Sequence, residues 1–526
     1  MKKKMTALLA TGIVALTALA GCFSGPSGSA ADSSTPKAGS TLLVGLQGDP
    51  TSFNPDASPD DFAYFVEENI FSRLVKTDWN NKIIPDLANS WEISPDGKTY
   101  TFKLKSNVKW HDGQAFSSAD VVWTMNEIIS KKGYLVSSLG NVASIDAPDA
   151  NTVVFHLKQS DSSLLPSLSF LGAFILPKHV FDGSDWTTNK AAQSPIGTGP
   201  FKFVDYQKAV SISLKANQDY FGGAPNIDKL IYKIIPDGNT ALQAFNNGEL
   251  DILGTVPPYA EVAGLQKAVG TKVVKNSTLG RYYLTFNLTK KPWNQPQVRQ
   301  AIALAVDRSE ILDKAFKGVG KVADGFYASS IRWAYNDQAV LPKKDIQKAQ
   351  KLLEQAGYKK DSQGYYFSAD IVTFNMDPFQ DTSTIVKSNL QAIGINAKVT
   401  VLEQAAWMQR CLTDRNFDVT IMGGSVGPDP SALANRVATN GPLNFMGYSN
   451  PTVDQLFAQG VALVKESARA AKYKQIQQIL ATDLPIVPLV EDITVNVYKS
   501  YLSGLPYDDA LGKAAMTEFT YVSINK

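Results

Sequence analysis

The sequence PDLANSWEISPDGKTYTFKL occupies residues 85–104 and predicts a β-hairpin. Its centre, Ser94-Pro95-Asp96-Gly97-Lys98, consists of residues that favour turns. The flanking runs, Trp91-Glu92-Ile93 and Thr99 to Leu104, are rich in the β-branched and aromatic residues that favour strands. This stretch is therefore expected to form two adjacent antiparallel strands.

Further strands are expected on both sides of the hairpin. Runs with β-branched or aromatic residues and partial alternation lie at residues 41–46, 152–157, 210–214 and 282–288. Amphipathic helices lie between and after these runs. One begins after Pro296, a second runs from Asp345 as N-cap to Gly357, and a third includes Tyr473 and Leu480. The interleaving of strands and helices predicts an α/β or α+β body.

The composition favours a large protein with a nearly neutral surface. With 526 residues, of which 44% are hydrophobic, the chain can build two or three lobes. Without Lys2, Lys3 and Lys4, Lys+Arg falls from 51 to 48, against 49 Asp+Glu. This balance argues against nucleic acid as a partner and against a polybasic membrane surface, since both need clustered positive charge.

The first residues predict export from the cytoplasm. Lys2-Lys3-Lys4 precedes an apolar stretch, and Leu19-Ala20-Gly21-Cys22 resembles the lipobox of bacterial lipoproteins. Residues 1–21 are therefore expected to be a lipoprotein signal peptide and Cys22 the lipid anchor. The alternative is an ordinary secretory signal followed by a chance cysteine. Residues 22–39 are rich in Ser, Gly, Ala and Pro and predict a flexible tether.

The remaining cysteine, Cys411, has no partner once Cys22 is acylated, so no intrachain disulfide is expected. Cys411 is interpreted as a small buried apolar residue rather than a nucleophile. No later run of about eighteen apolar residues occurs, so the membrane contact would come from Cys22 alone.

Three groups of stretches together resemble family 5 of the extracellular solute-binding proteins, the oligopeptide- and dipeptide-binding components of ABC importers. The first group contains the hairpin. The groups are residues 85–104 with 108–113 and 118–121, residues 195–201 with 217–225, and residues 298–303 with 306–308 and 448–454. Individually these stretches are turns, bends and core elements, so they identify the fold rather than the ligand.

The resemblance implies an α/β fold of the periplasmic-binding-protein-like type II (cluster C). Two main lobes and an extra inserted lobe would surround a hinged ligand cleft. The implied lobes are lobe I at 40–65, 195–285 and 495–526, lobe II at 66–194, and lobe III at 286–494. Two crossovers, near 283–287 and near 493–496, would form the hinge.

The resemblance also implies a function. The protein would be a monomeric substrate-binding lipoprotein on the outer face of the bacterial cell membrane, capturing short peptides and delivering them to an ABC permease. Peptide main-chain groups would carry the affinity, as in an added strand. No cofactor, metal or nucleic acid is expected, and no enzymatic activity.

The ligand site is implied residue by residue. In relatives, an aspartate after a strand that resembles residues 417–424 pairs with the peptide ammonium, but Gly427 stands at that position here. Asp429 could substitute, or could only shape a turn. The other residues expected at the site are Met422, Gly423, Gly424, Ser425, Asp49, Trp407 and Arg410.

Some of these assignments have structural alternatives. Asp49 could cap its loop and Trp407 could belong to the core. Arg410 and Arg415 could hold a ligand carboxylate or could be surface charges.

The sequence leaves two competing classes of function open. The sequence contains no H-E-x-x-H, G-x-S-x-G or paired-cysteine metal motif, so a secreted hydrolase is a remote alternative. Members of the superfamily bind oligosaccharides or nickel chelates, which are the nearer alternatives on the same fold. Tyrosines and tryptophans could stack on sugars, whereas only His111, His156 and His179 are present for a chelate.

Overall fold

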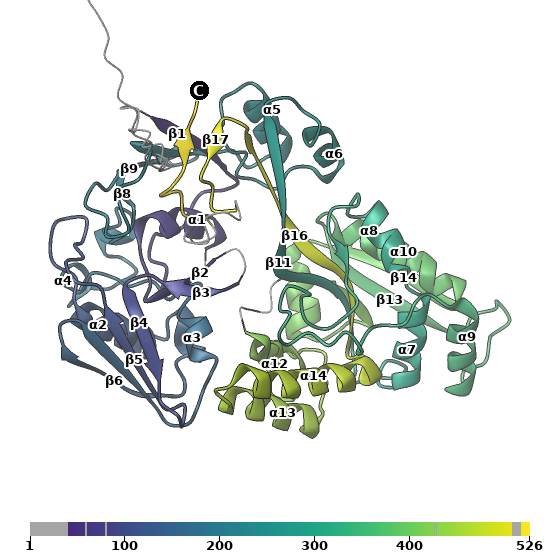
Figure 1. The fold of residues 1–526 in the computed structure, drawn as a ribbon. Coiled ribbons are helices and arrows are strands. Elements are labelled where there is room, and N and C mark those ends of the chain that lie inside the picture. Colours follow the sequence, from purple (N-terminus) through teal and green to yellow (C-terminus); the bar gives the residue numbers. More distant parts are fainter. Residues whose placement is uncertain (1–39, 58–59, 79–80, 425–426, 428, 508–516) are drawn as a thin grey trace, which may run out of the picture. The chain divides into compact units, whose positions relative to one another are not determined.

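A computed structural model describes residues 40–57, 60–78, 81–424, 427, 429–507 and 517–526. Helices and strands are interleaved along this part of the chain, which confirms the predicted α/β class (Figure 1). The predicted signal peptide, the tether and Cys22 lie outside the described residues, as does Ser425.

The predicted hairpin is present as β4 (Ala88–Ile93) and β5 (Thr99–Leu104), which pair antiparallel. In the turn, the Gly97 N–H donates to the Ser94 carbonyl at 2.8 Å. The sequence prediction succeeds here because turn chemistry and strand propensity are both local properties.

The hairpin forms half of a four-stranded antiparallel sheet. β5 pairs with β7 (Thr152–Leu157), and β7 pairs with β6 (Val142–Asp149), so the strand order is β4-β5-β7-β6. The helix α2 (Ser118–Lys131) contacts β6 and β7.

A second sheet contains the first strand of the described chain. β1 (Thr41–Leu46) pairs in parallel with β10 (Lys229–Ile234), followed by β9 (Ser211–Ala216) and β8 (Phe201–Gln207). The whole hairpin sheet lies between β1 and β10 in sequence. The helix α1 (Asp61–Ile70) contacts β8. The chain thus leaves this sheet after β1 and returns to it at β8.

A third sheet includes parallel strands joined by a helix. β13 (Phe367–Phe374) pairs in parallel with both β14 (Ile395–Leu402) and β15 (Val419–Met422). The helix α10 (Phe379–Ala392) connects β13 to β14 and contacts both strands.

The three predicted helices are confirmed. They are α7 (Pro296–Ala305), α9 (Ile346–Gln355) and α14 (Glu466–Asp483). The Asp345 side chain accepts the N–H of Lys348 at 2.9 Å, as expected of an N-cap.

Two long strands link these regions. β11 (Thr271–Phe286) pairs antiparallel with β16 (Ile486–Lys499), and the two run side by side in Figure 1. β11 also pairs with β15, so both strands belong to the sheet with the order β12-β16-β11-β15-β13-β14.

β11 and β16 contribute to two different hydrophobic cores. Leu284 and Val487 are buried in the core of the parallel strands. At the other end of the pair, Val495 and Val497 are buried against α5 (Gly238–Asn246). Between these ends the register of β11 is interrupted, as described below. A third core is built from buried side chains of the first two sheets and the segments packed on them.

Shorter elements complete the description. They include β2 (Val75–Thr77), β3 (Ile83–Pro85), β12 (Lys321–Val322), β17 (Leu502–Ser503), β18 (Ser523–Ile524), α3 (Leu164–Ser167), α4 (Lys178–Phe181), α6 (Val262–Leu265), α8 (Arg308–Lys314), α11 (Gln404–Trp407), α12 (Ala434–Val437) and α13 (Pro451–Ala462). In the part of the chain that the structure covers, every helix is too short or too polar to cross a bilayer.

Cys411 is fully buried, as the sequence predicted. Burial raises the pKa of its thiol to about 11. At neutral pH the thiol is therefore protonated and a poor nucleophile.

Candidate functional site

A cavity of about 320 Å³ lies where β1, α1, β11 and β16 meet. Its volume falls within the range of about 300–1,000 Å³ that is usual for small-molecule sites. Its walls combine aromatic rings with strand backbone. The lining residues are Val44, Gly45, Leu46, Gln47, Phe62, Phe65, Tyr232, Ile252, Gly254, Thr255, Val256, Tyr259, Tyr282, Asp492, Ile493, Thr494, Val495, Asn496, Val497, Tyr507, Thr517 and Phe519.

One wall depends on two glycines. The Gly45 N–H donates to the Ile252 carbonyl at 3.1 Å, which holds β1 against residues 252–254. A Cβ on Gly254 would lie 1.9 Å from the Gly45 carbonyl oxygen, and Gly254 has a φ of +66°. Only glycine combines this conformation with so close a backbone approach.

A second wall is formed by α1 and the C-terminal segment 517–519. Phe62 and Phe65 of α1 line the cavity. One turn further along α1, Asn69 Nδ2 donates to the Thr517 carbonyl at 2.8 Å, and its Oδ1 accepts the Phe519 N–H at 2.9 Å. One buried amide therefore positions two lining residues.

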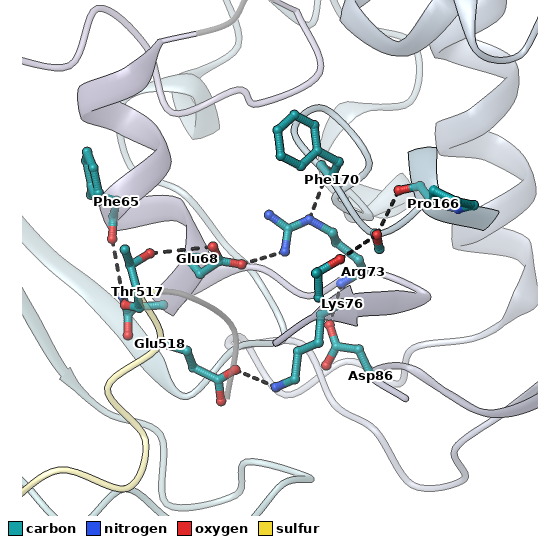
Figure 2. A network of polar contacts seen from close by, with 12 residues as sticks. Phe65, Glu68, Arg73, Lys76, Asp86, Pro166, Phe170, Thr517 and Glu518 are labelled. Carbon is teal, nitrogen blue, oxygen red and sulfur yellow. Dashed lines mark hydrogen bonds and ion pairs between the residues drawn. The ribbon is translucent and has the colours of Figure 1, made fainter. Parts of the chain in front are cut away.

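Ion pairs behind this wall hold the same segment (Figure 2). Lys76 pairs with Glu518, and Thr517 Oγ1 donates to Glu68 Oε2 at 3.5 Å. Glu68 in turn pairs with Arg73 at 2.5 Å. Thr517 and Phe519 line the cavity, whereas Glu518 between them binds Lys76 behind it. Successive residues of this segment therefore face alternately the cavity and the buried ion pair.

The floor of the cavity is the interrupted part of the β11–β16 pair. The register runs to Ser277 opposite Ile493 and resumes at Arg281 opposite Glu491, so residues 278–280 form a bulge facing Asp492. Such bulges re-aim side chains. Here the bulge lies beside Asp492, which lines the cavity.

The bulge leaves space around the side chain of Asp492. Thr278 Oγ1 donates to the Asp492 main-chain oxygen at 3.2 Å. The same hydroxyl oxygen accepts the Gly280 N–H at 2.8 Å. A Cβ on Gly280 would lie 3.2 Å from Asp492 Oδ2. The absence of a side chain at Gly280 therefore leaves room for this carboxylate.

Burial raises the pKa of Asp492 above its ordinary value. Burial of Tyr259 raises the pKa of its phenol to about 12, and burial raises the pKa of Tyr282 further. The charge of Asp492 adds a smaller effect in the same direction to both phenols. A carboxylate in this environment gains from a cation that enters the cavity.

None of the predicted site residues that the structure describes lines this cavity. Asp49 Oδ1 accepts the Tyr206 hydroxyl and the Ala209 N–H, both at 2.8 Å. The Trp407 ring is buried, and its Nε1 donates to Thr420 Oγ1 at 2.9 Å. Trp407 therefore has the core environment that was its alternative, whereas Asp49 binds the β8–β9 region instead of capping its own loop; ligand contact by either residue stays a prediction.

The guanidinium of Arg410 has intramolecular partners, and the main chain of Arg415 has one. Arg410 Nη2 donates to Asp370 Oδ2 at 2.8 Å, and its Nε donates to the Asn416 carbonyl at 3.0 Å. The Arg415 carbonyl accepts a hydrogen bond from Asn287 Nδ2 at 2.7 Å. Whether either guanidinium also binds a ligand stays a prediction.

Asp429 is buried in an ion pair with Arg469. Arg469 Nη2 lies 2.8 Å from Oδ1 and 2.6 Å from Oδ2, and the Ser431 N–H donates to Oδ1 at 2.9 Å. For Asp429 to bind a ligand ammonium, this ion pair would have to open. Gly427, the position at which the family resemblance implies an aspartate, has a φ of +98°.

The residues at the end of β15 lie closer to the cavity. Met422 pairs with Tyr283 of β11, and the Gly424 carbonyl accepts the Arg281 N–H at 3.2 Å. A Cβ on Gly423 would lie 3.0 Å from the ring of Tyr282, which lines the cavity. Their predicted contact with a ligand remains untested.

Sequence reasoning missed Asp492 as a candidate, although it placed a crossover at residues 493–496. The available signal was an acidic pair, Glu491-Asp492, that follows the apolar run from Ile486 to Val490. Glu491 is the structural member of the pair: Ser329 donates to it through its N–H at 3.2 Å and its hydroxyl at 2.6 Å.

Comparison with known proteins gives a consistent result along most of the chain. The family model of the bacterial extracellular solute-binding proteins, family 5 Middle, matches residues 82–444. The oligopeptide-binding protein AppA of Bacillus subtilis (strain 168) is 30% identical over 509 residues, which cover 92% of this chain and 93% of that protein.

Solved structures agree with this similarity. The ABC transporter substrate binding protein CtaP from Listeria monocytogenes superimposes with a TM-score of 0.84 at 26% identity, covering 93% of this chain and 100% of that one. AppA from Bacillus subtilis in complex with a nonapeptide superimposes with a TM-score of 0.77 at 28% identity, covering 92% and 99%. The predicted type II fold is confirmed.

Proposed function

This chain belongs to family 5 of the bacterial extracellular solute-binding proteins, and we propose that it captures short peptides for delivery to an ABC permease. Its relative AppA is named as an oligopeptide-binding protein and has been solved with a nonapeptide. The family is one of transport proteins rather than enzymes, which agrees with the proposed role.

The observation that carries the proposal is an open strand edge inside the cavity. Along one edge β16 pairs with β11, and at Val490 and Glu491 its other edge pairs with β12. Further along, the Leu253 N–H donates to the Val497 carbonyl at 2.9 Å. From residue 492 to 496, no strand of the described chain occupies this second edge, and these same residues line the cavity.

A peptide could complete this edge as an added strand. Main-chain hydrogen bonds would then supply affinity without requiring one peptide sequence. The aromatic and apolar walls would accept varied side chains. This arrangement favours peptides over oligosaccharides, since a sugar cannot continue the β-ladder of β16.

The bulge at residues 278–280 is the proposed hinge. On either side of it, β11 and β16 contribute to different cores, so bending there would move the two cores relative to each other. The lobe boundaries expected from the sequence, 40–65 with 195–285 and 495–526, 66–194, and 286–494, remain part of this proposal.

The proposal is tested with peptides whose backbone is altered. A strand presents its N–H groups to a given edge at every second residue, so N-methylation of alternate residues removes one set of donors at a time. One methylated set should abolish the thermal stabilisation given by the parent peptide, while the other should preserve most of it. Equal loss from both sets would contradict strand addition.

Parallel measurements address the alternatives. Native mass spectrometry of the purified chain should detect bound peptide, and an oligosaccharide panel serves as the control in the thermal-shift assay. Stabilisation by sugars alone would refute the peptide proposal. Recovery of each peptide at its intact mass after incubation is expected; cleavage would indicate a hydrolase.

We place the chain at the outer face of the cell membrane, anchored through Cys22. This part of the proposal rests on the sequence Leu19-Ala20-Gly21-Cys22. Labelling of cells with a palmitate analogue should mark the wild type and spare Cys22→Ala. Light scattering should give the mass of a monomer. Equal labelling of both forms, or the mass of a dimer, would contradict the respective point.

A further inference from the structure

The cavity is apolar and aromatic except for one formal charge. Asp492 is the only carboxylate among its lining residues, and these described residues include no lysine, arginine or histidine. Aromatic rings line much of the remainder. They are Phe62, Phe65, Tyr232, Tyr259, Tyr282, Tyr507 and Phe519.

The Asp492 carboxylate has no cationic partner in the described chain. The N–H of Ile493 is a local donor to it, whereas the hydroxyl of Thr278 donates to the Asp492 main-chain oxygen at 3.2 Å. Asp429, by contrast, is neutralised, since it pairs with Arg469 at 2.6 Å. A partly desolvated carboxylate without a counter-charge costs stability, so its placement in a ligand-sized cavity favours a ligand that supplies the charge.

Two rings beside Asp492 are fixed in position. Tyr259 and Tyr282 both contact the buried ring of Phe316, with centroids at 6.2 and 4.7 Å respectively. The Asp492 charge acts on both phenols. Ring faces attract cations, and an ionised carboxylate accepts strong hydrogen bonds from an ammonium group.

We propose that Asp492, flanked by Tyr259 and Tyr282, binds an organic ammonium group of the ligand at the hinge. This inference deepens the proposed function and relies on it for the identity of the ligand as a peptide. The ammonium could belong to the peptide's amino terminus or to a lysine side chain. The site would supply the anion that Gly427 lacks, from β16 instead of the loop after β15.

The first experiment does not depend on peptide binding. Benzylammonium and benzyl alcohol have similar shapes but differ in charge, and both can be titrated at millimolar concentration in a thermal-shift or NMR assay. The wild type should prefer benzylammonium, and Asp492→Asn should lose this preference. The control Asp337→Asn removes the same charge from an exposed residue and should behave as wild type.

The second experiment identifies the source of the ammonium. Calorimetry compares one apolar peptide with a free amino terminus, its N-acetylated form, and an N-acetylated form containing one lysine. The wild type should bind at least one cationic form about 10- to 100-fold more tightly than the neutral form, the factor expected of a charge-assisted hydrogen bond. In Asp492→Asn this ratio should fall close to one.

The outcomes separate the two proposals. If Asp492→Asn still binds the neutral peptide, the variant is folded and the site intact. An unchanged cationic preference in that variant, or no preference in the wild type, would overturn the ammonium site alone. If no peptide binds but benzylammonium does so through Asp492, the peptide function fails while the ammonium site stands.

Discussion

Replacing Asp429 by asparagine tests whether this carboxylate stabilises the fold or anchors a ligand. The sequence allowed either role, but in the structure Asp429 accepts two hydrogen bonds from Arg469, at 2.6 and 2.8 Å. The partner is well fixed, because Arg469 also donates to the Gly460 carbonyl at 3.2 Å and lies over the ring of Trp333 at 5.1 Å.

The expected cost follows from the burial of both partners. Their side chains are only 6% and 8% exposed, for Asp429 and Arg469 respectively, so solvent screens the pair weakly. Removing one partner of such a pair costs about 3–5 kcal/mol, because the remaining charge stays desolvated. Asparagine still accepts one hydrogen bond, so we expect about 3 kcal/mol for Asp429→Asn.

A double-mutant cycle isolates the ion pair from other effects of the substitution. Asp429→Asn, Arg469→Met and the double variant are compared by urea-induced unfolding followed through tryptophan fluorescence, to which nearby Trp333 contributes. The double variant should regain about 1–2 kcal/mol relative to the sum of the single losses. Binding of a free-amine peptide relative to its N-acetylated form should be unaffected by Asp429→Asn.

Two results would refute this reasoning. Strictly additive losses would mean that Asp429 and Arg469 do not stabilise each other. An unchanged unfolding transition with selective loss of free-amine binding would mean that the ion pair opens and Asp429 is the anchor after all. In that case the ammonium site at Asp492 would have to be reconsidered as well.

Three further predictions concern the cavity wall and the buried titratable groups. Gly254→Ala should lower the unfolding temperature far more than Gly248→Ala. A Cβ at residue 254 would lie 1.9 Å from the Gly45 carbonyl oxygen, whereas a Cβ at residue 248 would meet open space. Equal shifts of the unfolding temperature would contradict the close approach. Asp492→Asn should be more stable to unfolding than the wild type at neutral pH, because a raised pKa means that ionisation of the carboxylate disfavours the folded state. This gain should vanish in acid, where the carboxylate is protonated. A gain that persists in acid would show that ionisation of Asp492 is not its cause. Burial lowers the pKa of His111 to about 4 from 6.5, so the free energy of unfolding is undiminished above pH 6.5 and falls as the pH drops from 6.5 toward 4. Across this range the free energy of unfolding should depend less steeply on pH in His111→Gln than in the wild type. Identical slopes would exclude His111 as the cause.

The parts of the fold that the sequence predicted well are those determined by near neighbours. The hairpin at residues 85–104 follows from a turn and two β-rich flanks, and the helix from Ile346 to Gln355 follows from apolar spacing and the Asp345 cap. Family resemblance then supplied the type II arrangement, which local patterns could not have distinguished from other α/β folds.

The site was less predictable because its residues are brought together only by tertiary structure. Its walls come from regions far apart in the sequence, among them those near residues 44–47, 62–65, 254–259, 492–497 and 517–519. Trp407 shows the corresponding limit for a single residue: an aromatic on a helix can be a core ring or a ligand wall, and only packing against Phe374 and Thr420 distinguishes them.

Glu491 and Asp492 show how adjacent residues acquire different roles. Successive side chains of a strand point to opposite faces, so Glu491 is directed to Ser329 in the protein interior while Asp492 is directed to the cavity. The bulge at residues 278–280 removes the strand partner that would otherwise face Asp492. The same irregularity, as the proposed hinge, would provide a bending point between two cores and would leave a carboxylate available to a ligand. Ligand charge and lobe closure would then be coupled at one position, because an ammonium bound to Asp492 would lie against the two strands of the proposed hinge.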